Sequence, residues 1–139
     1  MATIAVNPFI LKDVLLTIES DNYEAHVSQV EFTPSASTQA WQGLTPTATF
    51  TDVTTATWTA NLSYAQDWSN PDSLSYKLHE EEGAEWDVVF KPVSGSGPSV
   101  NATLIVTPGA IGGTVNGYAV ASVSLAVKGK PQLVAPVGP

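Results

Sequence analysis

Cysteine and arginine are both missing from this chain of 139 residues. Without cysteine there is no disulfide scaffold and no thiolate metal site. Without arginine the chain lacks the forked guanidinium that binds phosphates and base edges, and only 5 lysines stand against 13 acids, for a net charge of −8. Because a negative surface repels DNA, a protein that reads nucleic-acid sequence is not expected.

Long apolar runs are absent as well. No run approaches the roughly 20 residues that span a bilayer, so no membrane partner is expected. The first twenty residues have no basic region before their apolar residues, and Asn7-Pro8 interrupts them, which is unlike a signal peptide. We therefore expect a protein made in the cytoplasm. Hydrophobic residues make up 43% and charged residues 13%, which is typical of one globular domain with an uncharged polar surface.

Alternating apolar residues predict strands along most of the chain. Clear examples are 13–20, 85–92, 100–108 and 119–129, and a change of parity within 23–32 predicts a β-bulge. The fold class is therefore all-β with one short α-helix, a sandwich or barrel. We expect an N-terminal arm at 1–10, one domain at 11–129 and a proline-rich C-terminal tail at 130–139.

Two polar segments lie in the middle of the predicted strands. Residues 33–46 form a long loop or an extended hairpin arm, in which Trp41 and Leu44 are isolated apolar residues. Residues 47–64 predict a threonine-rich hairpin whose second strand buries every second residue, namely Ala56, Trp58, Ala60, Leu62 and Tyr64.

One helix is predicted near 70–82. Asn70 is a suitable N-cap, Pro71 fits the first helical position, and Gly83 can end the helix in a left-handed conformation. Leu74 and Leu78 share its inward face. Glu80, Glu81 and Glu82 fill the last turn, where the helix dipole is negative and acids are unfavourable.

Catalytic and ligand-binding patterns are not found. The two histidines, His26 and His79, fall on a predicted strand and on the helix, without a serine in a nucleophile pattern. The glutamates at 80–82 have no calcium-loop spacing, so neither a metal nor a cofactor is expected. Exposed tryptophans could stack on sugars. Trp41 is either an anchor folded back on the sheet or an interface residue, because aromatic residues dominate interface hot spots.

The order of several motifs resembles that of the major tail tube proteins of long-tailed (siphophage-type) bacteriophages, particularly those of actinobacterial phages. The matching pieces cover most of residues 30–131 and are, in order, "EFTPSASTQAWQGLTP", "ATWTANLSYAQDWSNPDSLSYKLHEEEG", "VVFKP", "VTPGAIGG" and "SVSLAVKGKP". They are fairly specific when taken together.

The resemblance implies a structural virion protein that forms hexameric rings, stacked into a hollow tail tube. Adjoining sheets would form a barrel around a lumen that holds the tape-measure protein and later passing DNA, with tail terminator and distal tail proteins at the tube ends. It implies no catalytic residues and no cofactor.

Several residues then become candidates for subunit contacts or for lumen charge. The subunit-interface candidates are Trp41, Leu44, Glu80, Glu81, Glu82, Phe9 and Ile10. The lumen-charge candidates are Glu19, Glu24 and Glu31. The alternative function is a carbohydrate-binding or adhesin-like sandwich that uses Trp41 or Trp68.

Overall fold

The computed structural model describes residues 2–6, 8–93 and 97–135 of the chain. Strands dominate it, and there is one short helix among these residues, as the sequence predicts. The elements are β1 (Leu15–Ile18), β2 (Asp21–Asn22), β3 (Val27–Ser35), β4 (Thr38–Gln42), β5 (Thr49–Val53), β6 (Thr57–Ala65), α1 (Leu74–Glu80), β7 (Glu85–Lys91), β8 (Ser99–Ile105), β9 (Val120–Val127) and β10 (Gln132–Val134).

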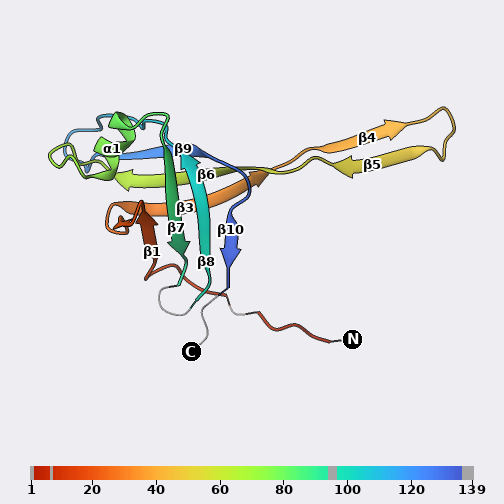
Figure 1. Ribbon diagram of the computed structural model, residues 1–139, viewed down its shortest axis with the longest axis horizontal. Helices are drawn as coiled ribbons and strands as arrows, with labels where there is room; N and C mark the ends of the chain where they lie inside the picture. The colour runs from red at the N-terminus through yellow and green to blue at the C-terminus, as the bar shows by residue number, and fades with distance from the viewer. Residues whose placement is uncertain (1, 7, 94–96, 136–139) are drawn as a thin grey trace.

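The main sheet has the strand order β2-β1-β7-β8-β9-β6-β3, with β10 also paired to β8. Strands β8 and β9 pair only at Leu104↔Val127 and Ile105↔Ala126 among the described residues, and β10 pairs with the other end of β8. The sheet therefore folds over at this junction into two layers. One layer holds β1, β7, β8 and β10, and its strands run across those of the layer formed by β9, β6 and β3 (Figure 1).

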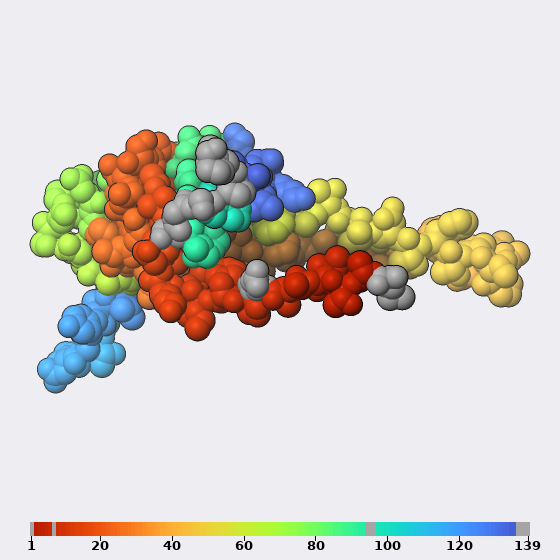
Figure 2. All heavy atoms as spheres, turned by 90° about the horizontal axis from the view of Figure 1, so that it is seen from below, coloured from red at the N-terminus to blue at the C-terminus, as the bar shows by residue number. Residues whose placement is uncertain are grey.

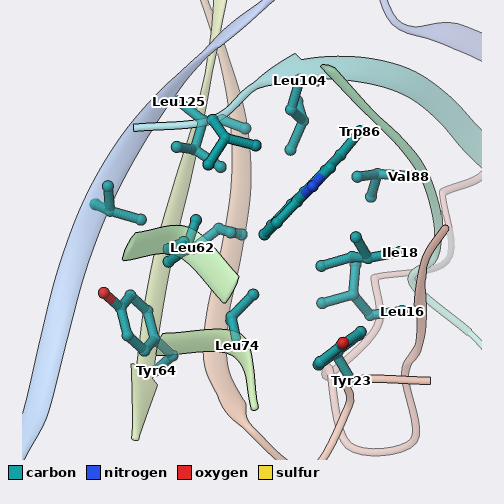
Figure 3. Close-up of a cluster of buried hydrophobic side chains, with 14 of the residues drawn as sticks. Leu16, Ile18, Tyr23, Leu62, Tyr64, Leu74, Trp86, Val88, Leu104 and Leu125 are labelled. Atoms are coloured by element: carbon teal, nitrogen blue, oxygen red, sulfur yellow. The ribbon is translucent and has the colours of Figure 1, made fainter. Parts of the chain in front are cut away.

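The core lies between the two layers. Trp86 on β7 is 2% exposed and sits in the middle of the cluster, between Leu125 and Val88 (Figure 3). The inward residues predicted for 85–92 are confirmed, since Trp86, Val88 and Phe90 are all buried. The predicted bulge is confirmed as well, by a register shift between Val27 and Gln29 on β3.

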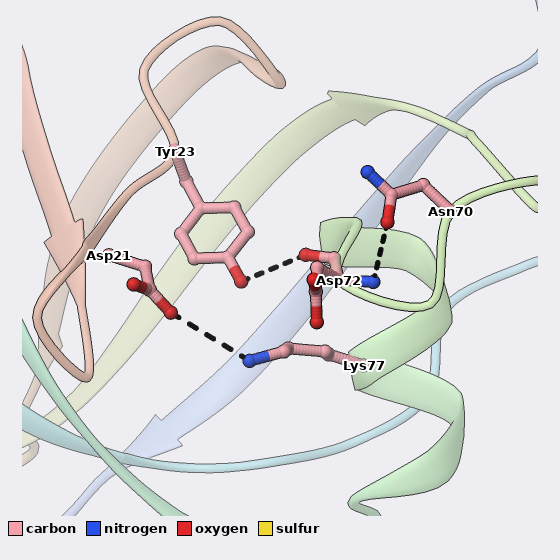
Figure 4. A network of polar contacts seen from close by, with 5 residues as sticks. All are labelled: Asp21, Tyr23, Asn70, Asp72 and Lys77. Carbon is pink, nitrogen blue, oxygen red and sulfur yellow. Dashed lines mark hydrogen bonds and ion pairs between the residues drawn. The ribbon is translucent and has the colours of Figure 1, made fainter.

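Helix α1 closes one end of the core and begins later than predicted. Ser73, not Asn70, is the N-cap, and its buried hydroxyl accepts the Tyr76 N–H at 3.3 Å. Asn70 instead caps the preceding turn, where its Oδ1 accepts the Asp72 N–H (Figure 4). Leu74 and Leu78 are fully buried, as predicted. Gly83 is left-handed as predicted, with a φ of 86°, but it does not end the helix. Glu81 is the C-cap, and the Gly83 N–H donates to the Val106 carbonyl at 2.9 Å.

A hairpin of β4 and β5 projects far from the body along the long axis of the molecule (Figure 1). Of the two alternatives for 33–46, the extended hairpin arm is confirmed, since the segment holds the end of β3, the strand β4 and the start of the hairpin turn. The predicted hairpin within 47–64 is wrong, because β5 pairs with β4, whereas β6 pairs with β3 and β9. Trp58 is only half-buried, since it lies near the outer end of β6.

The two ends of the chain differ from each other. Residues 2–6 and 8–14 form no strand or helix, and Phe9 and Ile10 are exposed. The segment expected to leave the fold as a tail instead contains β10, which pairs with β8 through Leu133↔Val100 and its neighbours. The prolines of this segment led to the prediction of a tail, but Leu133 and Val134 are apolar residues that can pack in a strand. The last four residues of this tail lie outside the described residues.

Candidate functional site

The outer face of the layer β9–β6–β3 is a continuous polar surface. The strand register places Gln29, Ser63 and Ser122 in one row across the three strands. The next row is formed by Glu31, Asn61 and Ser124, and the third by Thr33, Thr59 and Ala126. Because successive side chains of a strand point to opposite faces, the residues between them point into the core, among them Ala60, Leu62 and Tyr64.

Hydrogen bonds connect the side chains of this polar face across all three strands. Asn61 is central: its Nδ2 donates to Thr33 Oγ1 at 3.2 Å, and its Oδ1 accepts from Ser124 Oγ at 2.7 Å. The hydroxyls of Ser63 and Ser122 lie 2.9 Å apart. Many of these donors and acceptors are therefore already paired with one another, which leaves fewer of them to bind a passing molecule.

The polar face carries almost no charge. Glu31 is the only charged residue in β3, β6 and β9, and it accepts a hydrogen bond from the Thr33 hydroxyl at 2.9 Å. Glu19 and Glu24, the other predicted lumen acids, lie in turns and not in strands. Glu19 accepts the Asp87 N–H at 2.9 Å beside β7, and Glu24 lies before β3, with one carboxylate oxygen buried. Glu24 and Glu31 line the same groove beside β3, whereas Glu19 lies apart from them beside β7.

This layer has an open edge on each side. β3 ends the strand order, and an open groove of about 580 Å³ separates it from residues 11–14 and from Leu16 of β1. On the other side, β9 leaves β8 after two described residue pairs, so Val120–Ser124 have no strand partner there among the described residues. Neither strand carries a lysine, and open edges usually carry one when they are to stay unpaired.

The hairpin places Trp41 and Leu44 at its outer end. Trp41 pairs with Phe50 across the two strands, and their rings lie 5.8 Å apart. The Trp41 side chain is 63% exposed, and Leu44 in the turn is fully exposed. Trp41 therefore does not fold back on the sheet. The turn is closed by the Gly43 N–H, which donates to the Ala48 carbonyl at 2.6 Å, and a side chain at Gly43 would meet the Ala48 methyl group.

The other predicted interface residues are separate from the hairpin. Glu80, Glu81 and Glu82 are exposed at the end of α1. Phe9 and Ile10 lie in the N-terminal arm, which runs beside the body on the same side as the hairpin (Figure 2). These groups do not come together in a single copy.

Neither histidine is placed beside a nucleophile. His26 is half-buried against the Tyr23 ring, at 5.3 Å between centroids, and its Nδ1 has no hydrogen-bond partner. His79 is exposed on α1, and its ring is nearly perpendicular to that of Trp68, with 6.3 Å between centroids. The described residues contain no cluster of three acids or histidines that could hold a metal ion. In that same part of the chain, no helix has the length and apolarity needed to cross a membrane.

Known structures share this fold, although no family model and no curated protein sequence matches the chain. One is a chain of the virion of a native gene transfer agent particle, with a TM-score of 0.61 at 16% identity over 88% of this chain and 96% of that one. Another belongs to the tail of an empty gene transfer agent particle with C6 symmetry, at 0.60 and 17%, with the same coverage.

A third chain belongs to the six-fold baseplate of the anti-feeding prophage, with a TM-score of 0.53 at 12% identity over 97% of this chain and 98% of that one. At these identities the likeness shows a shared fold.

Sequence reasoning missed the residues that build the polar face. Asn61, Ser63, Ser122 and Ser124 are ordinary polar positions within two strands that lie about sixty residues apart in the chain. The available signal was the alternation of polar and apolar residues at 59–64 and 121–125, which predicts one solvent-facing side for each strand.

Proposed function

We propose that this chain is a structural protein of a phage-type tail. Six copies of the chain form a ring, and such rings stack into a hollow tube for viral DNA. The polar face of β9, β6 and β3 carries the proposal, because it is wide, hydrogen-bonded within itself and free of cationic side chains. The similar chains belong to a virion, a tail and a baseplate, which supports a tail component.

The open edges provide a way to close the ring. If β3 of one copy adds to β9 of the next, the layer continues from subunit to subunit and its polar face lines the lumen. Such a contact is heterologous, with different surfaces on the two copies, and a heterologous contact closes into a ring when its rotation allows. Backbone pairing would then satisfy the edge groups that a single copy leaves exposed.

The chemistry of the polar face suits a conduit. Lysine and arginine would bind phosphates strongly and slow the passage of DNA, and neither occurs in the three strands. Glu31 adds one repulsive charge per subunit. In this proposal the tape-measure protein fills the lumen before DNA does, terminator and distal tail proteins cover the tube ends, and the chain acts without catalysis in the virion.

Electron microscopy and light scattering of concentrated protein test the proposal. We expect rings or tubes with a central channel, although assembly can require an initiating partner. The face is tested by Ser124→Cys, with Asn101→Cys on the outer face of β8 as the control, because the chain has no other thiol. In assembled tubes a thiol reagent attached to a large polymer should label the control and spare position 124. Equal labelling of both would contradict a lumen face.

A carbohydrate-binding module is the second candidate, because Trp41 and Trp68 are 63% and 38% exposed. Their placement does not favour a sugar platform, since one lies on the projecting hairpin and the other beside α1 at the far end of the body. Retention of the unassembled protein on a polysaccharide matrix, lost with Trp41→Ala, would favour this candidate.

A further inference from the structure

A shallow apolar groove lies where the loop 107–118 leaves the sheet. This loop projects from the end of the body opposite the hairpin (Figure 2). Its volume is about 320 Å³. The walls combine the segment after β6 with this loop, and the lining residues are Gln66, Trp68, Ile111, Gly112, Gly113, Thr114, Val115 and Ala119.

Gln66 holds the loop in place. Its Nε2 donates to the carbonyls of Gly112 at 2.8 Å and Val120 at 3.0 Å. Its Oε1 accepts the Gly112 N–H at 3.0 Å and the Trp68 indole N–H at 3.1 Å. Further back, Gly109 lies against the Tyr64 hydroxyl so closely that a side chain would not fit. The groove is thus built before any partner arrives, which lowers the entropy cost of binding.

Apolar side chains on this fixed loop point to solvent. Val115 is 84% exposed and Ile111 is 63% exposed, and Tyr118 beside them is almost fully exposed. A glycine-rich loop that Gln66 holds by two hydrogen bonds to Gly112, and that still exposes such residues, is typical of a contact surface.

The hairpin of β4 and β5 is a matching counterpart. It ends in the paired rings of Trp41 and Phe50 and in the exposed Leu44. A two-stranded hairpin is marginally stable by itself in water, and every residue of β4 and β5 is exposed. It therefore gains most from burial against another surface.

Charge favours the pairing of these two surfaces. The chain has a net charge of −8, so two copies repel each other wherever their acids face. The loop 107–118 has no charged residue, and Asp52 is the single charged residue between positions 33 and 56. Hairpin and groove can meet with almost no charge to desolvate and little repulsion to overcome.

We propose that the hairpin tip of one copy docks in the groove of Gln66, Trp68 and the loop 107–118 of a second copy, with Trp41 and Leu44 against Ile111 and Val115. The hairpin and the loop 107–118 beside the groove lie at opposite ends of the molecule, so the contact is head-to-tail and repeats from copy to copy. The proposed function enters only in taking a second copy of this chain as the partner.

Cross-linking between two single-cysteine variants tests the docking. Leu44→Cys and Val115→Cys are mixed under assembling conditions and treated with a short bismaleimide. A head-to-tail contact predicts a cross-linked dimer in the mixture and none in either variant alone, because position 44 meets position 115 and never itself. The double variant Leu44→Cys/Val115→Cys should give a ladder of longer species.

Val93→Cys in place of Val115→Cys is the matched control, since Val93 is an exposed valine after β7 and away from the groove. A link from position 44 to 93 and not to 115, or no link in the 44/115 mixture, overturns the docking. Val115→Asp should weaken assembly about tenfold or more, with the circular dichroism spectrum unchanged. Six-fold rings without the 44/115 link would support the proposed tube and refute the docking. A ladder of cross-linked species without rings would support the docking and contradict the proposed tube.

Discussion

The hairpin strand β5 and the strand β6 follow each other in the chain and share a threonine-rich composition, yet they have opposite roles. Every residue of β5 is exposed, whereas β6 buries Ala60, Leu62 and Tyr64 and pairs on both sides. The difference lies in the alternation: β6 has an apolar residue at each inward position, and β5 has the isolated Phe50. The body is therefore stabilised by its own core, whereas the hairpin buries none of its strand residues in its own copy, which fits the proposal that it docks on another.

The largest expected effect comes from removing a core ring in the body. Trp86→Ala should lower the free energy of unfolding by about 3–5 kcal/mol, because the ring is 2% exposed and its loss leaves a cavity between the layers. Chemical denaturation of the unassembled protein measures this. A loss below about 1 kcal/mol would show that the layers do not depend on this residue.

The hairpin should respond in the opposite way. Trp41→Ala should change the free energy of unfolding by no more than about 0.5 kcal/mol, since the ring is mostly exposed. It should weaken assembly by about 2 kcal/mol or more, as for an interface hot spot. Sedimentation at several concentrations measures the assembly. Thr51→Ala, on the opposite face of the hairpin, is the control and should assemble normally. Normal assembly of the Trp41→Ala variant would show that Trp41 is not an interface residue.

The body was more predictable from the sequence than the hairpin for a physical reason. Burial imposes a period of two on 85–92 and 119–129, so their strands and inward residues could be predicted. The hairpin buries nothing in this copy, and its threonines continue into β6 without a break, so its pairing partner could not be identified. The polar face could not be predicted from the sequence either, because it forms only after β3, β6 and β9 have paired.

The start of α1 gives a smaller effect within the body. Ser73→Ala should cost about 1–2 kcal/mol, because the hydroxyl caps the helix and is buried against the Asp67 carbonyl. Asn70→Ala should cost less, since Asn70 is exposed and its side chain holds only a turn. Thermal unfolding of both variants compares the two caps. A larger loss for Asn70 would mean that the helix depends on the turn before it.

Hydrogen exchange should distinguish the two ends of the chain, one of which belongs to the body and one of which does not. The amides of β10 that face β8 should be protected in the unassembled protein, because that strand belongs to the body. Amides at 2–6 and 8–12 should exchange rapidly until tubes form, since this segment has no strand partner among the described residues. Protection of the N-terminal arm in a single copy would contradict its role as an arm that orders on assembly.

The acidic turn after α1 should give the smallest effect on the body and a separate effect on assembly. Glu80, Glu81 and Glu82 are exposed where the helix dipole is negative, so changing all three to glutamine should raise the free energy of unfolding slightly, by about 0.3 kcal/mol for each charge or less.

We further propose that this turn lies at or near a subunit boundary, where Lys12, Lys128 or Lys130 of another copy can approach it. Lys128 already binds Glu85 of its own copy at 2.8 Å, so an approaching acid would compete with that pair. If the boundary is real, the triple variant assembles differently and with a weaker dependence on salt, because exposed charges are screened beyond about 8 Å at physiological ionic strength. Turbidity measured across a salt series decides the matter: a stabilised variant with unchanged assembly and unchanged salt dependence would mean that these acids only face solvent.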